Sequence, residues 1–145
     1  IIAGEGRMKN QLQEMALGCA NITFLGFVPD TEVPSLLGRA KALLFPQLED
    51  AGITALEAVA AGTPVIAFGK GGVLTTLEEG KNALFFLEQN PESLLAAIEK
   101  FEDVSFSRSD IQEGVKKYDQ KVFDEKMQNF VLEKWKNRHP SLCGR

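Results

Sequence analysis

Short apolar runs alternate with segments of helical spacing along most of the chain. The apolar runs have the length of buried strands and fall at residues 1–3, 22–25, 42–45, 65–68 and 84–86. The segments between them predict helices at residues 8–17, 32–39 and 54–61, with a short helix at 73–79. Strands that alternate with helices predict a Rossmann-like, three-layer α/β fold, in which helices flank a parallel sheet.

The C-terminal part of the sequence predicts helices without further strands. Pro91-Glu92-Ser93 opens a helix through Phe101, because proline is tolerated in a first helical turn. C-terminal helices are expected over residues 107–137, at 107–118 and 120–137. The last helix carries an apolar stripe that we expect to pack onto the sheet. The stripe consists of Phe123, Met127, Phe130, Val131 and Trp135.

Composition fits one folded domain over residues 1–145. The chain is 44% hydrophobic and 25% charged, which is typical of a globular protein with its own core. Its net charge of −4 argues against broad nucleic-acid binding, which needs a basic face. The apolar run at 83–87 is too short to cross a bilayer, and no signal peptide is recognisable. A cytoplasmic location is therefore expected.

The cysteines and the histidine exclude several kinds of site. Cys19 and Cys143 lie far apart without metal-ligand spacing, so free thiols in a reducing cytosol are expected. His139 is the only histidine, which argues against a histidine-based triad or metal cluster. No metal and no cofactor are expected.

The strongest candidate chemistry lies between Glu49 and Glu57. These carboxylates are eight positions apart and bracket a glycine turn where a helix is expected to begin, near Ile53. A helix start directs free backbone N–H groups and the positive end of its dipole outward, which suits a phosphate. Carboxylates instead accept hydrogen bonds from the hydroxyl groups of a sugar or ribose. The combination predicts a sugar-nucleotide site.

Each carboxylate also has a purely structural interpretation. Thr54 and Glu57 have the spacing of a capping box, in which Glu57 would accept a hydrogen bond from the Thr54 amide. Glu49 has the alternative of a solvated loop carboxylate beside Asp50.

A series of ordered motifs, dense over residues 1–86, resembles the family 4 retaining glycosyltransferases, which have two Rossmann-like domains in the GT-B architecture. The E-x7-E signature is matched by Glu49 and Glu57. The other matching motifs are Ile1-Ile2-Ala3-Gly4-Glu5-Gly6, Ile22-Thr23-Phe24-Leu25-Gly26, Phe45-Pro46, Gly62-Thr63-Pro64-Val65-Ile66-Ala67 and Gly71-Gly72. The amino-acid sequence of these motifs is most similar to that of bacterial mannosyltransferases of O-antigen and lipopolysaccharide synthesis.

The resemblance implies a role for each candidate residue. Glu49 would contact the donor sugar as the catalytic candidate, and Glu57 would bind the nucleotide ribose. The amides of Ala51 and Gly52 would face the sugar. Those of Ile53 and Thr54 would face the diphosphate.

Two loops complete the implied donor site. The segment Gly26-Phe27-Val28 resembles the family loop that receives the base. Lys70-Gly71-Gly72 lies at the switch point where open α/β sheets bind ligands, although a flexible turn is an equally good interpretation of this loop. Lys70 could approach a phosphate, but a solvated loop lysine is the better interpretation of this residue.

The sequence departs from the family pattern at several points. Ala51 stands where an aromatic residue is usual, Thr75 where a glutamate is usual, and Ala83 where a glycine is common. The family's phosphate-binding Arg and Lys, carried by the central first strand and its loop, have no counterpart here, and neither has the acceptor-binding domain. Without that strand, residues 1–3 and 42–45 would pair directly, receive another chain between them, or leave a less stable domain.

The implied function is the donor-binding half of a retaining glycosyltransferase. It would transfer mannose from GDP-mannose to a glycan or lipid-linked acceptor, with the separate acceptor domain as its partner. The alternatives are a non-catalytic sugar-nucleotide-binding subunit and a sugar-nucleotide epimerase. The small basic tail of Lys134, Lys136, Arg138 and Arg145 has two interpretations, a solvated helix end or a contact with anionic lipid at the inner face of the membrane.

Overall fold

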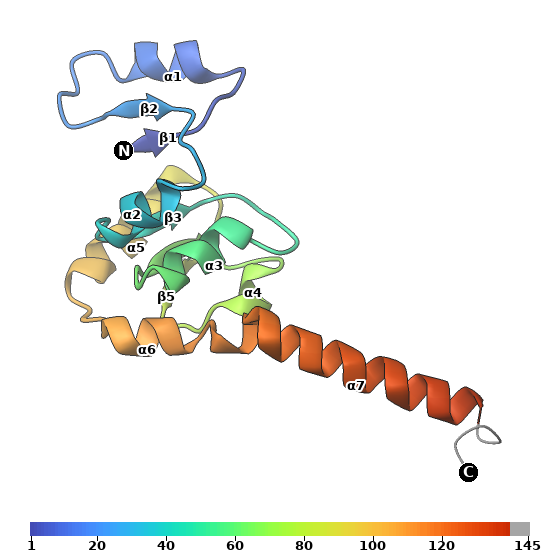
Figure 1. The fold of residues 1–145 in the computed structure, drawn as a ribbon. Coiled ribbons are helices and arrows are strands. Elements are labelled where there is room, and N and C mark those ends of the chain that lie inside the picture. The colour runs from blue at the N-terminus through green and yellow to red at the C-terminus, as the bar shows by residue number, and fades with distance from the viewer. Residues whose placement is uncertain (140–145) are drawn as a thin grey trace.

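The computed structural model describes residues 1–139, in which strands alternate with helices (Figure 1). The strands are β1 (Ile2–Ala3), β2 (Phe24–Gly26), β3 (Leu43–Phe45), β4 (Val65–Phe68) and β5 (Ala83–Phe86). The helices are α1 (Lys9–Met15), α2 (Val33–Gly38), α3 (Ile53–Ala60), α4 (Val73–Thr76), α5 (Pro91–Glu102), α6 (Arg108–Glu113), the 3-10 turn η1 (Lys116–Tyr118) and α7 (Gln120–Arg138). All strand pairs are parallel, which confirms the α/β class. Cys143 and Arg145 lie outside the described residues.

The strands form two separate sheets. One contains β1 and β2, and the other has the order β3-β4-β5. Figure 1 shows β1, β2 and α1 as a unit set apart from the remaining strands. β1 and β3 therefore do not pair with each other, which excludes one of the three outcomes expected for a missing central strand. Both residues of β1 are exposed, so the prediction of a buried strand at residues 1–3 is wrong. Its apolar side chains lack the second neighbour that would cover them.

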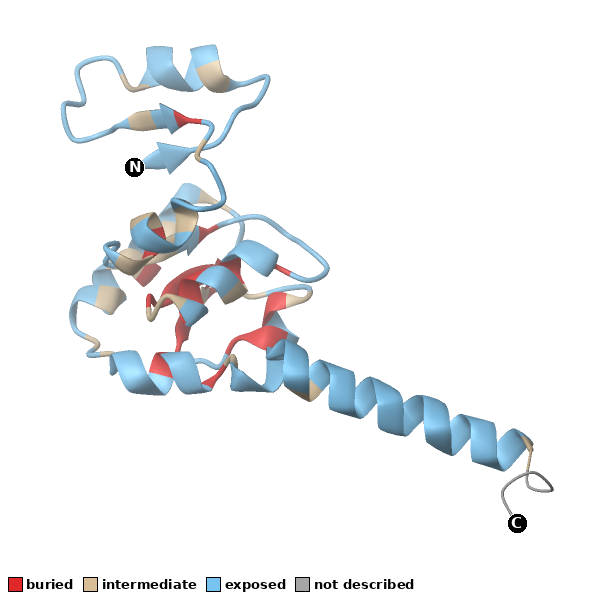
Figure 2. Cartoon of the chain, viewed as in Figure 1, coloured by how far each residue is buried: buried red, intermediate tan, exposed pale blue. Residues whose placement is uncertain are grey.

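The core surrounds the three-stranded sheet (Figure 2). Every residue of β4 is buried, as the sequence predicts. Val65 and Ala67 pack on one face with the α3 residues Ala55, Ala58 and Val59. The alternate residues Ile66 and Phe68 pack on the other face with Ala97 of α5. Helices thus cover both faces of this sheet, and α3 is fixed against the strands that precede and follow it.

Side-chain hydrogen bonds hold the connection between α3 and β4. The buried hydroxyl of Thr63 donates to the carbonyl of Leu37 in α2, at 2.7 Å. Arg108 and Gln112 of α6 donate to the carbonyls of Ala61 and Ala60, at 2.8 and 2.9 Å. The two bonds from α6 satisfy carbonyl groups at the end of α3, which have no partner within the helix.

Two predicted helices are shorter than expected. The segment 107–118 divides into α6 and η1 around Gly114, which lies against the buried side chain of Asn82. A Cβ atom at position 114 would lie 2.5 Å from Asn82 Nδ2, so this contact requires glycine. The helix expected at 73–79 ends at Thr76, because Leu77 is extended.

The longest helix, α7, projects from the domain (Figure 1). Its apolar stripe is exposed, with 56% exposure at Phe123 and 53% at Trp135. The expectation that this stripe packs onto the sheet is therefore wrong. The helix begins at the Asp119 cap, whose carboxylate accepts from the Lys121 amide, and from there it runs away from the sheet. A helical apolar pattern shows which face can be buried, but not against which surface.

Candidate functional site

The first turn of α3 lies directly after β3 and its loop. The helix begins at Gly52, a buried residue with a left-handed backbone (φ 66°) that favours glycine. The amides of Ala55 and Leu56 donate to the Gly52 carbonyl. Those of Ile53 and Thr54 make no hydrogen bond within residues 1–139. Two backbone donors are therefore available at the end of the helix where its dipole favours an anion.

Glu57 does not act as a helix cap. The N-cap is Gly52, without a side-chain cap, so Thr54 is the second helical residue rather than the cap. The capping-box interpretation of Thr54 and Glu57 is therefore wrong. Glu57 is exposed, and its carboxylate has no hydrogen-bond partner in the described part of the chain. It is free to accept hydrogen bonds from a ligand.

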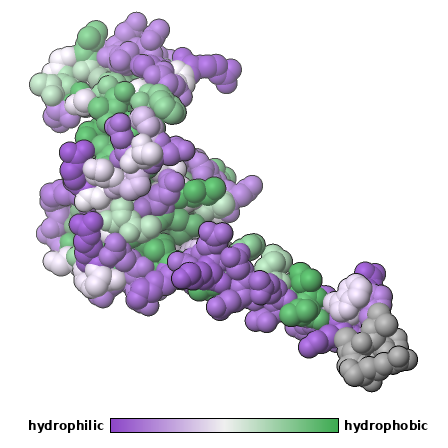
Figure 3. Space-filling view, in the orientation of Figure 1, coloured by the Kyte–Doolittle hydropathy of each residue, from purple (hydrophilic) through white to green (hydrophobic). Residues whose placement is uncertain are grey.

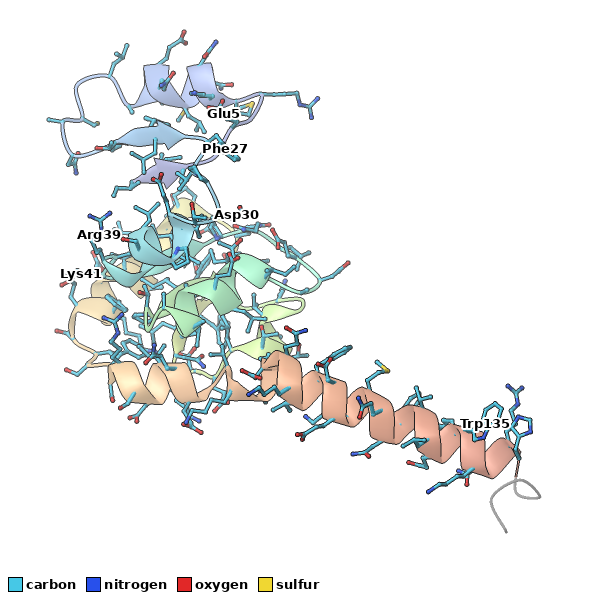
Figure 4. The ribbon with its side chains drawn as sticks, viewed as in Figure 1. Glu5, Phe27, Asp30, Arg39, Lys41 and Trp135 are labelled. Carbon is cyan, nitrogen blue, oxygen red and sulfur yellow. The ribbon has the colours of Figure 1, made fainter. Side chains whose placement is uncertain are left out.

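A cavity of about 1110 Å³ brings several of the candidates together. Thr54 and Glu57 line it from α3, and Phe27 and Val28 line it from the segment after β2. Gly26 precedes them as the last residue of β2. Figure 4 shows Phe27 on the segment that joins β2 to α2, next to the space between the two sheets. Candidates for base and ribose binding, separate in sequence, therefore share one cavity.

Glu49 lies next to the loop that contains Gly71 and Gly72. The Gly72 amide donates to the Glu49 carbonyl at 2.8 Å. A Cβ atom at position 72 would lie 1.8 Å from the Asp50 carbonyl oxygen, so the two loops can approach this closely only with glycine there. The Glu49 side chain is exposed and accepts from Gln47 Nε2 at 3.3 Å. The glycine loop (Lys70-Gly71-Gly72) therefore lies against the acidic loop, which contains Glu49 and Asp50.

Lys70 and Ala51 are not among the residues that line the cavity. Both are exposed, and the Lys70 ammonium lies 5.5 Å from the centre of the Phe68 ring. A cation beside an aromatic face is a common surface arrangement.

Three charged residues of the cavity were not anticipated from the sequence. Asp30 precedes α2, and Arg39 and Lys41 follow it (Figure 4). Lys41 also forms an ion pair with Glu102 at 3.0 Å. Their spacing resembles no ligand motif, and they reach the cavity only because α2 lies beside the gap between the sheets.

Glu5 is a further carboxylate near the base-binding candidates. Its Oε1 would lie 2.7 Å from a Cβ atom at Gly26, and it pairs with Lys9 at 2.8 Å. The hydrogen bond from Lys9 lowers the pKa of Glu5 below its ordinary value, and the Lys9 charge adds to this. A smaller contribution comes from the backbone N–H of Phe27, while partial desolvation acts in the opposite direction.

Comparison with known proteins identifies the family. Residues 1–118 match the profile described as "Glycosyl transferases group 1". The chain belongs to this family. It is 34% identical over 104 residues to an uncharacterized glycosyltransferase of Methanocaldococcus jannaschii, an alignment that covers 69% of this chain and 27% of the relative.

Two solved structures of other proteins have the same fold as this chain. The apo form of the lipopolysaccharide outer core galactosyltransferase WaaB superposes with a TM-score of 0.78 at 18% identity, over 92% of this chain and 40% of that one. Anabaena HepE, solved with UDP and glucose, gives a TM-score of 0.69 at 21% identity, over 90% and 39%. The chain is therefore a fragment of a GT-B fold and spans well under half of these proteins.

Residues 1–139 lack two further features. No helix there is both long enough and apolar enough to span a bilayer. The same residues contain no cluster of three or more His, Cys, Asp or Glu side chains suited to a metal ion.

Proposed function

We propose that this chain is the donor-binding half of a retaining glycosyltransferase that uses a nucleotide-diphospho-sugar. One observation carries the proposal: the uncapped Glu57 carboxylate and Thr54 open into the same cavity as Phe27 and Val28. This observation supports Glu57 as an acceptor for ribose hydroxyls, near the free amides of a helix start and an apolar segment suited to a base.

Each part of the donor then has its own binding group. The amides of Ile53 and Thr54 share the negative charge that develops on the departing diphosphate. Glu57 anchors the ribose, and Gly26, Phe27 and Val28 receive the base. Glu49, Ala51 and Gly52 orient the sugar, with Glu49 as the catalytic candidate. No metal is proposed, because the family resemblance implies that an Arg and a Lys complete the neutralisation of the diphosphate.

The donor we propose is GDP-mannose, with a glycan or lipid-linked acceptor held by the other half. This choice of donor is supported by the sequence of the motifs from Glu49 to Gly72, which resembles that of bacterial O-antigen mannosyltransferases. UDP-glucose is the competing donor, since the HepE structure contains UDP and glucose. An acceptor in the membrane would place the complete enzyme at its cytoplasmic face, where Lys134, Lys136 and Arg138 at the end of α7 would meet anionic lipid.

The test is equilibrium binding of GDP, GDP-mannose, UDP and UDP-glucose to the complete protein and to its Glu57→Gln variant. Glutamine keeps the size of the side chain and removes its charge. Loss of a charge-assisted hydrogen bond costs about 1.5–3 kcal/mol, so we expect GDP and GDP-mannose to bind roughly 10- to 100-fold more weakly. Glu92→Gln, in the first turn of α5, is the matched control and should bind like the wild type.

The pattern of outcomes separates the alternatives. Equal affinity of the wild type and Glu57→Gln for every nucleotide would overturn the proposed site. Preference for the uridine compounds, with Glu57 still required, would replace the donor but keep the site. Binding without any sugar transfer would indicate a non-catalytic subunit. Release of free nucleotide together with a new sugar epimer would indicate an epimerase.

A further inference from the structure

The base-binding candidates do not by themselves select a base. Gly26, Phe27 and Val28 have no hydrogen-bonding group in their side chains. The Phe27 side chain is 74% exposed, so its ring is available to stack on a base. Stacking hardly distinguishes one base from another, because every base has a flat π-face. Selection between guanine and uracil therefore needs a polar group in the same part of the cavity.

Most of the residues that line the cavity are apolar. Figure 3 shows this apolar surface where the unit of β1, β2 and α1 meets the rest of the domain. The polar side chains of the lining are those of Asp30, Arg39, Lys41, Thr54 and Glu57. Thr54 and Glu57 belong to α3, where the proposed function assigns them to the diphosphate and the ribose. Asp30 instead lies on the segment between β2 and α2 that also carries the base-binding candidates (Figure 4).

The two cations of the cavity are less suited to the base. Arg39 and Lys41 follow α2, at the opposite end of this helix from Asp30 (Figure 4). Arg39 Nε donates to the Ser35 carbonyl at 3.3 Å, and Lys41 forms its ion pair with Glu102. Both cations thus have partners within the domain and lie away from the base-binding candidates.

Asp30 does not have the structural role that its position suggests. An acidic residue just before a helix commonly accepts a hydrogen bond from an amide of the first turn. The N-cap of α2 is Glu32, and no side chain caps this helix. The Asp30 side chain is exposed, and its carboxylate has neither a hydrogen bond nor an ion pair with other groups of residues 1–139. Both of its oxygens are therefore available to a ligand.

We propose that Asp30 selects guanine as the base of the donor nucleotide, an inference that rests on the proposed donor site. Guanine carries two adjacent donors on its Watson–Crick edge, the ring N1–H and the exocyclic amino group. A carboxylate has two acceptor oxygens and can bind both donors at once. Parallel, charge-assisted hydrogen bonds of this kind are strong and depend on geometry.

Uracil presents a different pattern to the same carboxylate. Its ring N3–H lies between two carbonyl oxygens. A carboxylate that approaches this N–H gains one hydrogen bond and brings its second oxygen against a carbonyl oxygen of like partial charge. Asp30 therefore attracts guanine and disfavours uracil, and specificity commonly combines an attractive element with a repulsive one.

Binding of GDP, inosine diphosphate and UDP to the complete protein and to Asp30→Asn tests this role. Inosine diphosphate is GDP without the exocyclic amino group, so the two ligands differ in one of the two proposed contacts. Asparagine keeps the size of the side chain, removes its charge and replaces one acceptor by a donor. In the wild type we expect GDP to bind roughly 10-fold or more tightly than inosine diphosphate. In Asp30→Asn the two should bind within about threefold of each other, and UDP at least as tightly as in the wild type.

The ratios of these affinities are an internal control for folding. A variant that only distorts the cavity would weaken all three nucleotides by the same factor and leave the ratios unchanged, which would overturn the role of Asp30. The matched control is Glu32→Gln, the same chemical exchange at an exposed carboxylate that is not part of the cavity lining. It should bind all three nucleotides like the wild type.

The Glu57→Gln variant separates the role of Asp30 from the donor site itself. If Glu57→Gln weakens nucleotide binding while Asp30→Asn keeps the wild-type ratio of GDP to UDP affinity, the donor site stands and the selection by Asp30 is overturned. A wild type that prefers UDP, with Glu57 still required, overturns it as well. If no nucleotide binds, or if Glu57→Gln changes nothing, the donor site fails and the role of Asp30 fails with it.

Discussion

Gly72 is the residue at which a single added carbon has the largest predicted effect. In Gly72→Ala the new methyl group would lie 1.8 Å from the Asp50 carbonyl oxygen, so the acidic loop must move. We expect a loss of about 1–3 kcal/mol in the free energy of unfolding, measured in urea, together with weaker nucleotide binding. Gly6→Ala, with no atom within 4 Å of the new carbon, should leave both unchanged. Equal effects of the two variants would show that the loops do not touch.

Glu5 provides a prediction about pH. Its pKa in the folded chain is lowered from the ordinary 4.5, chiefly by Lys9. The stabilisation from this carboxylate is therefore complete above the unfolded pKa and disappears as the pH falls through the folded pKa. We expect Lys9→Met to move the Glu5 midpoint upward, toward 4.5, in a carboxyl-carbon NMR titration. An unchanged midpoint would show that Lys9 is not the cause.

Single residues of the site could be predicted where the residues next to them in the sequence indicate their role. Glu57 and Thr54 could be assigned to a helix from the glycine turn before them, and the structure places Thr54 in its first turn and Glu57 in its second. The loop contact of Gly72 and the cavity position of Asp30 could not be predicted in this way. Both depend on segments that are distant in sequence, and one sequence does not show their distances.

At the scale of elements, α5 has the clearest local determinant. Asn90 Oδ1 accepts from the Ser93 amide at 2.8 Å, and Pro91 occupies the first turn. We expect Asn90→Ala to lower the free energy of unfolding by about 1 kcal/mol, because one helix amide loses its partner. Asn90→Ser keeps an acceptor and should recover most of this loss. Thermal and urea unfolding of the three proteins provide the measurement.

Elements with strong local signals in the sequence were predicted well. Which elements lie next to them in space was not predicted. The apolar run of β4 and the proline start of α5 correspond closely to the structure. The exposure of β1 could not be deduced from its apolar residues, because burial depends on a neighbouring strand. Gly114 interrupts the predicted helix at 107–118 for a tertiary reason, its contact with Asn82.

At the scale of the whole molecule, α7 contributes little to the stability of the described domain. Phe130 is 55% exposed, whereas Phe45 is 1% exposed in the core. In this chain we expect Phe130→Ala to change the free energy of unfolding by less than about 0.5 kcal/mol. The same truncation at Phe45 should cost about 3–5 kcal/mol. A loss above roughly 1 kcal/mol for Phe130→Ala would show that the stripe on α7 is covered in solution.

The first unit of the fold has almost no interior of its own, since Gly26 is the only buried residue among residues 1–30. During translation this unit leaves the ribosome before the strands of the main core exist. Because burial of apolar surface is the main force that stabilises folded chains, the unit should stay unfolded until later segments emerge. The earliest synthesised part of this chain is therefore expected to fold last, and a ribosome-bound chaperone would meet it in extended form.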